Sequence, residues 1–221
     1  MSRPRSGREA DTRRPTHVIV SVRTSPGRAG DGRSISWRSD AMPADLFGFD
    51  SVARLRVQVA VLWLGGEDEV DVLLDWTDAK DFTAPVVKAR GRTPLGKAVR
   101  LALSKIEDQK GRYNQSGVAY NRPWVFVITD GEPTDHDWEQ AAAECQQAEQ
   151  ARKAVVYGVA VGEGNLEKLA RFCNPERRPL RLQGLEFKKL FVWLSRSTSS
   201  ASRETPGQTK ELAPITWSAP T

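Results

Sequence analysis

The segment that most constrains the fold is residues 124–129, a nearly unbroken apolar run that is followed directly by Asp130 and Gly131. Apolar runs of this length without alternation are typical of strands that are buried on both faces, as in the centre of a parallel sheet. Such a strand needs covering elements above and below the sheet. The segment therefore predicts a layered structure of helices and strands.

The remainder of the chain divides into short apolar strands and amphipathic helices. Apolar runs, either β-branched or alternating, predict strands at residues 17–22, 55–64, 70–74, 154–161 and 180–182. The glycine pair at 65–66 lies between two of these runs and predicts an antiparallel hairpin. Helical spacing of apolar residues predicts helices that start at Thr93, Asp137, Asn165 and Glu186. Residues 110–122 are polar and predict a loop.

Strands that alternate with helices after one hairpin predict the fold class. We expect an α/β, doubly wound, mainly parallel sheet with one antiparallel hairpin edge and helices on both faces, as in Rossmann-like folds. Residues 17–198 are expected to form this single domain. Residues 1–16 predict a disordered basic lead-in, and residues 199–221, which are rich in Ser, Thr and Pro, predict a disordered tail.

The net charge of +5 is local to the start of the chain. The first 40 residues contain nine arginines, no lysine and four acidic residues, so they carry the whole excess, and the rest of the chain is balanced. An arginine-rich arm that binds nucleic acid is therefore an alternative reading, tested by deleting residues 1–16 and following salt-sensitive DNA binding. The arginines of residues 1–16 have no interleaved aromatic side chains, so we expect a solvated tail instead.

Cysteine content and hydropathy indicate the cellular compartment in which the protein is expected. The two cysteines, Cys145 and Cys173, form no CxxC or Cys/His cluster, which argues against a disulfide framework or a zinc site. No apolar run approaches the roughly 18 residues that a membrane span needs. The start of the chain also has no apolar core of a secretory signal. We expect a cytoplasmic protein with neither a membrane nor a nucleic-acid partner.

Two segments supply candidate ligands at one edge of the expected sheet. Ligands of open α/β sheets bind beyond the carboxyl ends of the strands. Residues 91–96 precede a helix and contain the Thr93 hydroxyl, and residues 128–135 follow a strand and contain the Asp130 carboxylate. Hydroxyl and carboxylate oxygens are hard ligands that suit Mg²⁺.

These segments resemble the von Willebrand factor A (VWA) domain, and are closely similar to its bacterial TerY-like branch. The similar motifs are Gly-x-Thr-Pro-Leu-Gly at residues 91–96 and Thr-Asp-Gly-Glu-Pro-Thr-Asp at residues 129–135, followed by Trp138. The last predicted helix, with Phe-Val-Trp-Leu-Ser at residues 191–195, is also similar to that branch. The resemblance covers about residues 50–197.

The resemblance implies a metal-ion-dependent adhesion site that holds Mg²⁺. In such domains an Asp-x-Ser-x-Ser loop after the first strand, a Thr from a second loop and an Asp from a third provide the ligands. Carried over to this sequence, the metal ligands are Ser25, Thr93 and Asp130. A carboxylate of a protein partner often completes the coordination.

The first loop departs from this pattern at two of its three ligand positions. Arg23 stands in place of the Asp and Gly27 in place of the last Ser, and only Ser25 matches. These substitutions count against Mg²⁺ as a cofactor, because a guanidinium next to the metal is unfavourable whereas one next to Asp130 is favourable. Our hypothesis is that the Arg23 guanidinium occupies the metal position and pairs with Asp130. Natural loss of the metal site and a frame or start-site artefact within residues 1–40 both explain the departure.

The resemblance implies a non-enzymatic, protein-binding adaptor. TerY-like proteins belong to tellurium-resistance and stress gene clusters, with kinase-like and phosphatase-like proteins as partners. The alternative from another class is a metal-dependent hydrolase on a similar sheet, although the sequence offers it no clear nucleophile. Residues 91–98 also approach a P-loop, but Ala98 replaces its metal-binding hydroxyl and Pro94 removes a phosphate-binding N–H.

Overall fold

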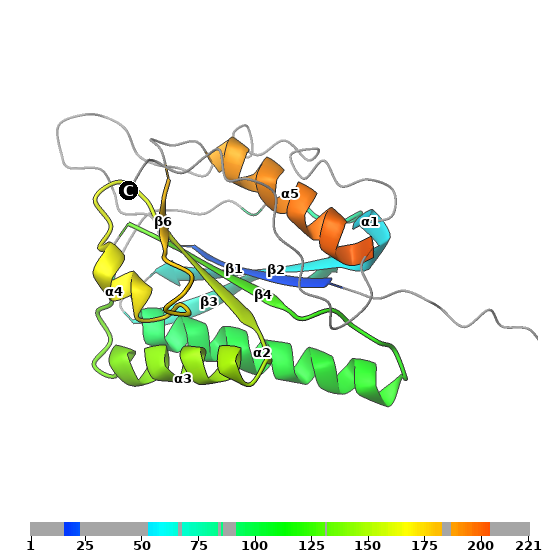
Figure 1. Ribbon diagram of the computed structural model, residues 1–221, viewed down its shortest axis with the longest axis horizontal. Coiled ribbons are helices and arrows are strands. Elements are labelled where there is room, and N and C mark those ends of the chain that lie inside the picture. Colours follow the sequence, from blue (N-terminus) through cyan, green and yellow to red (C-terminus); the bar gives the residue numbers. More distant parts are fainter. Residues whose placement is uncertain are drawn as a thin grey trace, which may run out of the picture.

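The computed structural model describes residues 16–22, 53–65, 68–83, 85, 92–130, 132–182 and 187–203. Within these residues a six-stranded sheet is covered by helices on both faces (Figure 1). The strands are β1 Thr16–Val22, β2 Val57–Gly65, β3 Glu69–Asp78, β4 Trp124–Thr129, β5 Val155–Ala160 and β6 Leu180–Arg181. The helices are α1 Ala53–Arg56, α2 Leu95–Gln115, α3 Trp138–Gln150, α4 Leu166–Ala170 and α5 Phe187–Arg203.

The sheet is doubly wound, as predicted. Its strand order is β3-β2-β1-β4-β5-β6, and all neighbouring pairs are parallel except the antiparallel hairpin of β2 and β3. In the register, Val18 of β1 lies between Val59 of β2 and Trp124 of β4. From β1 the chain adds β2 and β3 on one side of the sheet, and from β4 it adds β5 and β6 on the other side. The carboxyl ends of β1 and β4 therefore form the switch point at which ligands of such sheets bind.

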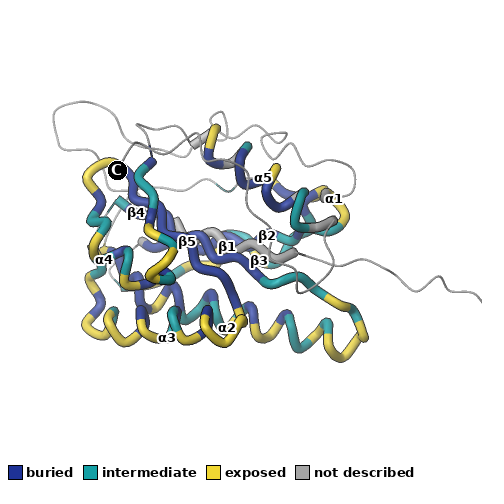
Figure 2. The backbone as a smooth tube through the Cα atoms, in the orientation of Figure 1, coloured by how far each residue is buried: buried dark blue, intermediate teal, exposed yellow. Residues whose placement is uncertain are grey.

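Helices α2 and α3 cover one face of the sheet, and α5 with α1 covers the other (Figures 1 and 2). β4 and β5 are buried along their whole length, which confirms the prediction of a central strand at residues 124–129. The face under α5 is aromatic: the rings of Phe126 and Tyr157 stack at 4.7 Å between centroids, and Trp193 of α5 meets both edge-on.

The face under α2 and α3 is made mainly of aliphatic and small residues. Ala98 and Ala102 of α2 and Ala141 of α3 are fully buried, which lets the two helices pack closely. Arg100 of α2 joins them at the surface, with hydrogen bonds to Asp137 and Glu144. Both cysteines are free, as expected, and both are buried. Within the described residues, every helix is too short or too polar to cross a bilayer.

The prediction of a loop over residues 110–122 is wrong at its start, because α2 continues to Gln115. The extra turn presents few apolar side chains, so it has no amphipathic pattern. It is stabilised instead by polar contacts: Gln109 donates to Gln58 of β2 at 3.0 Å, and the Tyr113 hydroxyl donates to the same side-chain oxygen. Hydrogen bonds to a neighbouring strand produce no apolar periodicity, so the sequence pattern could not predict this turn of the helix.

Two other boundaries differ from the sequence prediction. Leu55, taken as the first residue of a strand, lies in the short helix α1 and is 53% exposed, and β2 begins at Val57. At the other end of the chain, α5 runs to Arg203, beyond residue 198, where we placed the end of the domain. Thr198 is buried and its hydroxyl donates to the Leu194 carbonyl, so a polar sequence continues the helix.

Candidate functional site

The candidate site lies at the carboxyl edge of the sheet. Thr129 ends β4 and Asp130 follows it, while Thr93 lies two residues before Leu95, the first residue of α2. Thr129 is buried and its carbonyl accepts a hydrogen bond of 2.9 Å from Val161 N–H, which fixes the end of β4 against the residue after β5. Asp130 is half-buried at this position.

Thr93 is joined to the segment after β4 by two reciprocal hydrogen bonds. Its own N–H donates to Thr134 Oγ1 at 3.0 Å, and its carbonyl accepts from Thr134 N–H at 2.9 Å. Thr93 is only 1% exposed. These bonds involve the main chain of Thr93, and its hydroxyl makes no hydrogen bond with another described residue. The second-loop hydroxyl and the third-loop segment are therefore held at the same place on the sheet edge.

Asp135 attaches the same segment to the start of α2. Its Oδ2 accepts a hydrogen bond of 2.8 Å from Lys97 N–H, in the first turn of the helix, where N–H groups have no helical partner. Gly96 permits this approach, because a Cβ there would lie 2.7 Å from Asp135 Oδ2 and 3.1 Å from Ala141 Cβ. The sequence analysis does not predict this contact between Asp135 and the start of α2.

The rim of the site carries an exposed ion pair between the loop after β4 and helix α4. Glu132 accepts hydrogen bonds from Lys168 Nζ and from Asn165 Nδ2, the latter at 2.9 Å. These hydrogen bonds, first of all the one from Lys168, lower the pKa of Glu132. Asn165 also caps α4 through its Oδ1, which accepts from Lys168 N–H at 3.0 Å, as its sequence position predicted. The pair connects the loop after β4 with α4.

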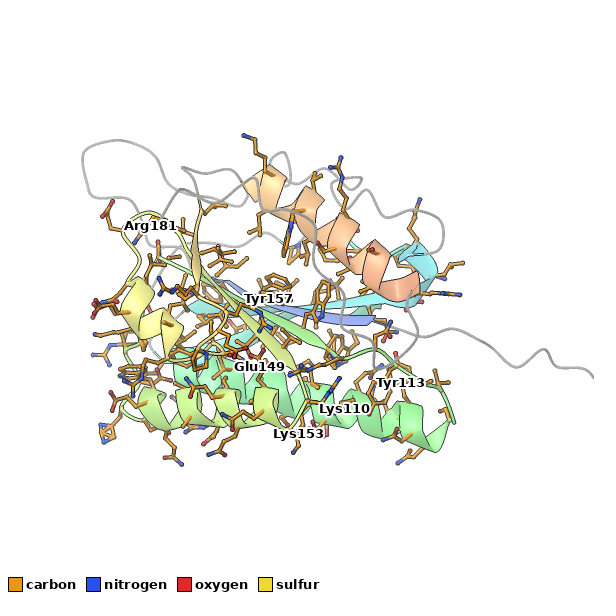
Figure 3. The ribbon with its side chains drawn as sticks, viewed as in Figure 1. Lys110, Tyr113, Glu149, Lys153, Tyr157 and Arg181 are labelled. Atoms are coloured by element: carbon orange, nitrogen blue, oxygen red, sulfur yellow. The ribbon has the colours of Figure 1, made fainter. Side chains whose placement is uncertain are left out.

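Arg181 stabilises the adjoining loop after β5. Its guanidinium donates to the carbonyl of Gly162 and, at 3.1 Å, to that of Gly164 (Figure 3). A side chain on the last residue of β6 thus orders the loop that borders the site. The strand predicted at residues 180–182 is confirmed over Leu180–Arg181, and its arginine binds the loop after β5.

The first loop, with Arg23, Ser25 and Gly27, lies outside the described residues, so the proposed pairing of Arg23 with Asp130 stays a hypothesis. Within the part of the chain that the structure describes, no group of three His, Cys, Asp or Glu side chains could hold a metal ion. Of the three predicted ligands, the described residues contain the hydroxyl of Thr93 and the carboxylate of Asp130.

The two cysteines lie in the core of the domain, and His136 lies on its surface. Burial raises the pKa of both Cys145 and Cys173 to about 12, so neither is a thiolate near neutral pH. His136 is exposed in the segment before α3.

The sheet order and the position of the site define the class of fold. No family model matches the chain, and no curated protein matches it in sequence. Solved structures do match it, and they include VWA domains. The chain has the VWA fold: an α/β doubly wound sheet with the candidate site at its carboxyl edge.

Three of the matching structures describe the extent of the likeness. They are proximal thread matrix protein 1 from the mussel byssus (TM-score 0.53, 14% identity, 83% of this chain), the ArnB paralog VWA2 from Sulfolobus acidocaldarius (0.50, 13%, 84%) and the von Willebrand factor domain of the type V pili tip protein Mfa5 from Porphyromonas gingivalis (0.50, 9%, 89%). The chain spans about half of the first two, 49% and 46%, and 99% of the third is covered. At these identities the likeness concerns the fold alone.

Proposed function

We propose that this chain is a non-enzymatic VWA adaptor domain that binds a protein partner at the carboxyl edge of its sheet. The binding face comprises the rim around Thr93 and Asp130, together with Ser25 of the first loop. The observation that carries the proposal is the pair of hydrogen bonds between Thr93 and Thr134. This contact supports a common position for the Thr93 loop and the segment after β4, which are the proposed second and third ligand loops, at the carboxyl edge of the sheet.

The ligand atoms on this edge are oxygens, which suit Mg²⁺, but their total negative charge is too small for it. Hydroxyl and carboxylate oxygens are its usual ligands, and Thr93, Asp130 and Ser25 would be the residues to hold it. Asp130 is the single carboxylate among these three, and Arg23 brings a positive charge to the loop that normally supplies a second one. We therefore propose that the partner is bound without Mg²⁺, with the Arg23 guanidinium in the metal position.

The partner class follows from the similarity to the TerY-like branch. On this proposal the chain acts in the cytoplasm of a bacterium, in a tellurium-resistance or chemical-stress system. Its partners are kinase-like or phosphatase-like proteins encoded in the same gene cluster. Genes adjacent to this one are the first candidates to express for binding.

The experiment is a binding assay between the purified chain and each protein encoded beside it, with and without Mg²⁺. We expect binding in both conditions, and loss of binding in Asp130→Ala. The matched control is Asp108→Ala, which removes an exposed carboxylate from α2 and should leave binding unchanged. Equal binding by the native chain and by Asp130→Ala would show that the carboxyl edge is not the interaction surface.

A further inference from the structure

Strand β3 is the last strand at one end of the sheet, and among the described residues only β2 pairs with it. In its first half the pairing is regular, because Glu69–Val72 lie opposite Leu62–Gly65 without interruption. Alternate N–H and C=O groups of a strand at the end of a sheet point away from its neighbour, where another strand can bind them. The first half of β3 therefore offers a main-chain edge.

The second half of β3 is protected by its own side chains. Trp76 N–H donates to Asp75 Oδ1 at 2.7 Å, and the Asp75 carbonyl accepts from Thr77 Oγ1 at 2.8 Å. The register against β2 also shifts on both sides of Val61. Bulges and irregularities of this kind keep an edge strand from pairing with another chain. The open part of the edge is therefore Glu69–Val72.

The two faces of this open edge differ in chemistry. Side chains alternate between the faces of a strand, so Glu69 and Asp71 share one face while Val70 and Val72 share the other. Val70 packs against the core under α2 and α3, whereas Val72 is 42% exposed. Glu69 and Asp71 are exposed and form no ion pair with a described residue. One face of the edge thus presents carboxylates and the other an apolar side chain.

The two carboxylates belong to a strongly acidic stretch. Residues 67–81 contain seven acidic residues and one basic residue, although the chain beyond residue 40 is balanced in charge. The acids of this stretch that have a basic neighbour among the described residues are Asp68, Asp75 and Asp81. The charges of Glu69 and Asp71 are not compensated in this way, so the open edge favours a basic partner.

A second copy of this chain is a poor occupant of the edge. Pairing of two β3 edges would bring Glu69 and Asp71 of one copy close to the same carboxylates of the other. Like charges that face each other across two strands are destabilising. The acidic side chains therefore disfavour self-association and select a strand of opposite charge.

We propose that the open edge of β3 binds an extended segment of a partner protein in which lysine or arginine alternates with apolar residues. Main-chain hydrogen bonds to residues 69–72 add this segment to the sheet as a further strand. Its basic side chains lie on the face of Glu69 and Asp71, and its apolar side chains lie on the face of Val72. The surface contains neither Thr93 nor Asp130, so it is independent of the proposed adaptor face.

A blocked synthetic peptide, Lys-Val-Lys-Val-Lys-Val, tests this surface when its binding to the native chain is followed by fluorescence anisotropy. We expect saturable binding at low ionic strength, and slower amide hydrogen exchange in residues 69–72 when the peptide is bound. The peptide Lys-Lys-Lys-Val-Val-Val has the same composition but cannot place its charges on one face, so it should bind more weakly. Equal binding of the two peptides, or slower exchange only in another segment, would overturn the proposal.

The variant Glu69→Lys/Asp71→Lys reverses the charge of the open edge and should weaken binding of the alternating peptide about tenfold. The matched control is Glu163→Lys/Glu176→Lys, which changes the net charge equally at exposed positions in the loops after β5 and before β6, toward the other end of the sheet. It should bind like the native chain. Equal binding by the two variants would overturn the proposal. So would protection of residues 69–72 that rises with the concentration of the native chain alone, because this would assign the edge to a second copy.

Discussion

Thr93 and Thr134 hold each other by two hydrogen bonds, from Thr93 N–H to Thr134 Oγ1 at 3.0 Å and from Thr134 N–H to the Thr93 carbonyl at 2.9 Å. The two residues belong to connections that are far apart in the sequence, one before α2 and one after β4. Their contact sets the position of the Thr93 main chain relative to the segment that begins at Asp130. The geometry of the carboxyl edge depends on this pair.

Replacing Thr134 by valine should destabilise the domain. The change removes Oγ1 and leaves the N–H of Thr93, a buried residue, without its acceptor, which costs about 1–3 kcal/mol. Urea unfolding measures the loss. Thr83→Val, at an exposed position, makes the same chemical change and should alter the stability little. Equal effects of the two substitutions would mean that the Thr93 contact does not stabilise the loop.

Two glycines of α2 should respond in opposite directions to alanine. At Gly96 a Cβ would lie 2.7 Å from Asp135 Oδ2, so Gly96→Ala should destabilise the domain by about 1–3 kcal/mol. At Gly111 a Cβ would meet no atom within 4 Å, so Gly111→Ala should stabilise it by about 0.5–1 kcal/mol through helix propensity. Urea unfolding of both variants tests this, and a stabilising Gly96→Ala would refute the close packing of Asp135 against α2.

Stability should fall at alkaline pH because of the buried thiols. Burial raises the pKa of Cys145 and Cys173 from 9.0 to about 12, so above pH 9 the thiols ionise in the unfolded chain before they ionise in the folded one. The unfolded state then binds fewer protons, and each thiol lowers the free energy of unfolding by about 1.4 kcal/mol per pH unit between pH 9 and 12.

Urea midpoints measured from pH 7 to 10 follow this loss. The variant Cys145→Ala/Cys173→Ala should be less stable at pH 7, because it leaves cavities, but its stability should fall less steeply above pH 9. If the native chain and the variant show the same slope, the thiols are not the groups responsible.

The sequence predicts the centre of this fold well and its margins less well. Residues 124–129 and 154–161 are buried on both faces, so their apolar runs have one simple explanation, and the structure confirms both strands. The last turns of α2 and α5 are polar. They depend on contacts such as that of Tyr113 with Gln58, which no periodicity reveals.

The candidate site shows the same division. The positions of Thr93 and Asp130 at one edge follow from the topology, which the strand and helix pattern indicates. Asp135 is different, because its carboxylate precedes α3 in the sequence but binds the first turn of α2. Gly96 was the available signal. It lies in a helix, where the backbone does not require glycine, so a glycine there indicates that another group approaches the helix closely.

The enzymatic alternative makes a separate prediction. A phosphatase or nuclease assay of the native chain with Mg²⁺ or Mn²⁺ should show no turnover, because an adaptor domain has no catalytic group. The assay includes Asp130→Ala, so that any contaminating activity is recognised as equal in both proteins. Clear turnover by the native chain that Asp130→Ala abolishes would favour a metal-dependent hydrolase.

The central claim is that a VWA-type edge here has lost its metal through the first loop. Calorimetric titration of Mg²⁺ into the native chain and into Arg23→Asp/Gly27→Ser tests it most directly. We expect no saturable binding by the native chain, and binding by the double variant, which regains the carboxylate and the hydroxyl beside Thr93 and Asp130. Tight binding of Mg²⁺ by the native chain would contradict the claim, and absence of binding by both would mean that residues 23–27 are not the missing ligand loop.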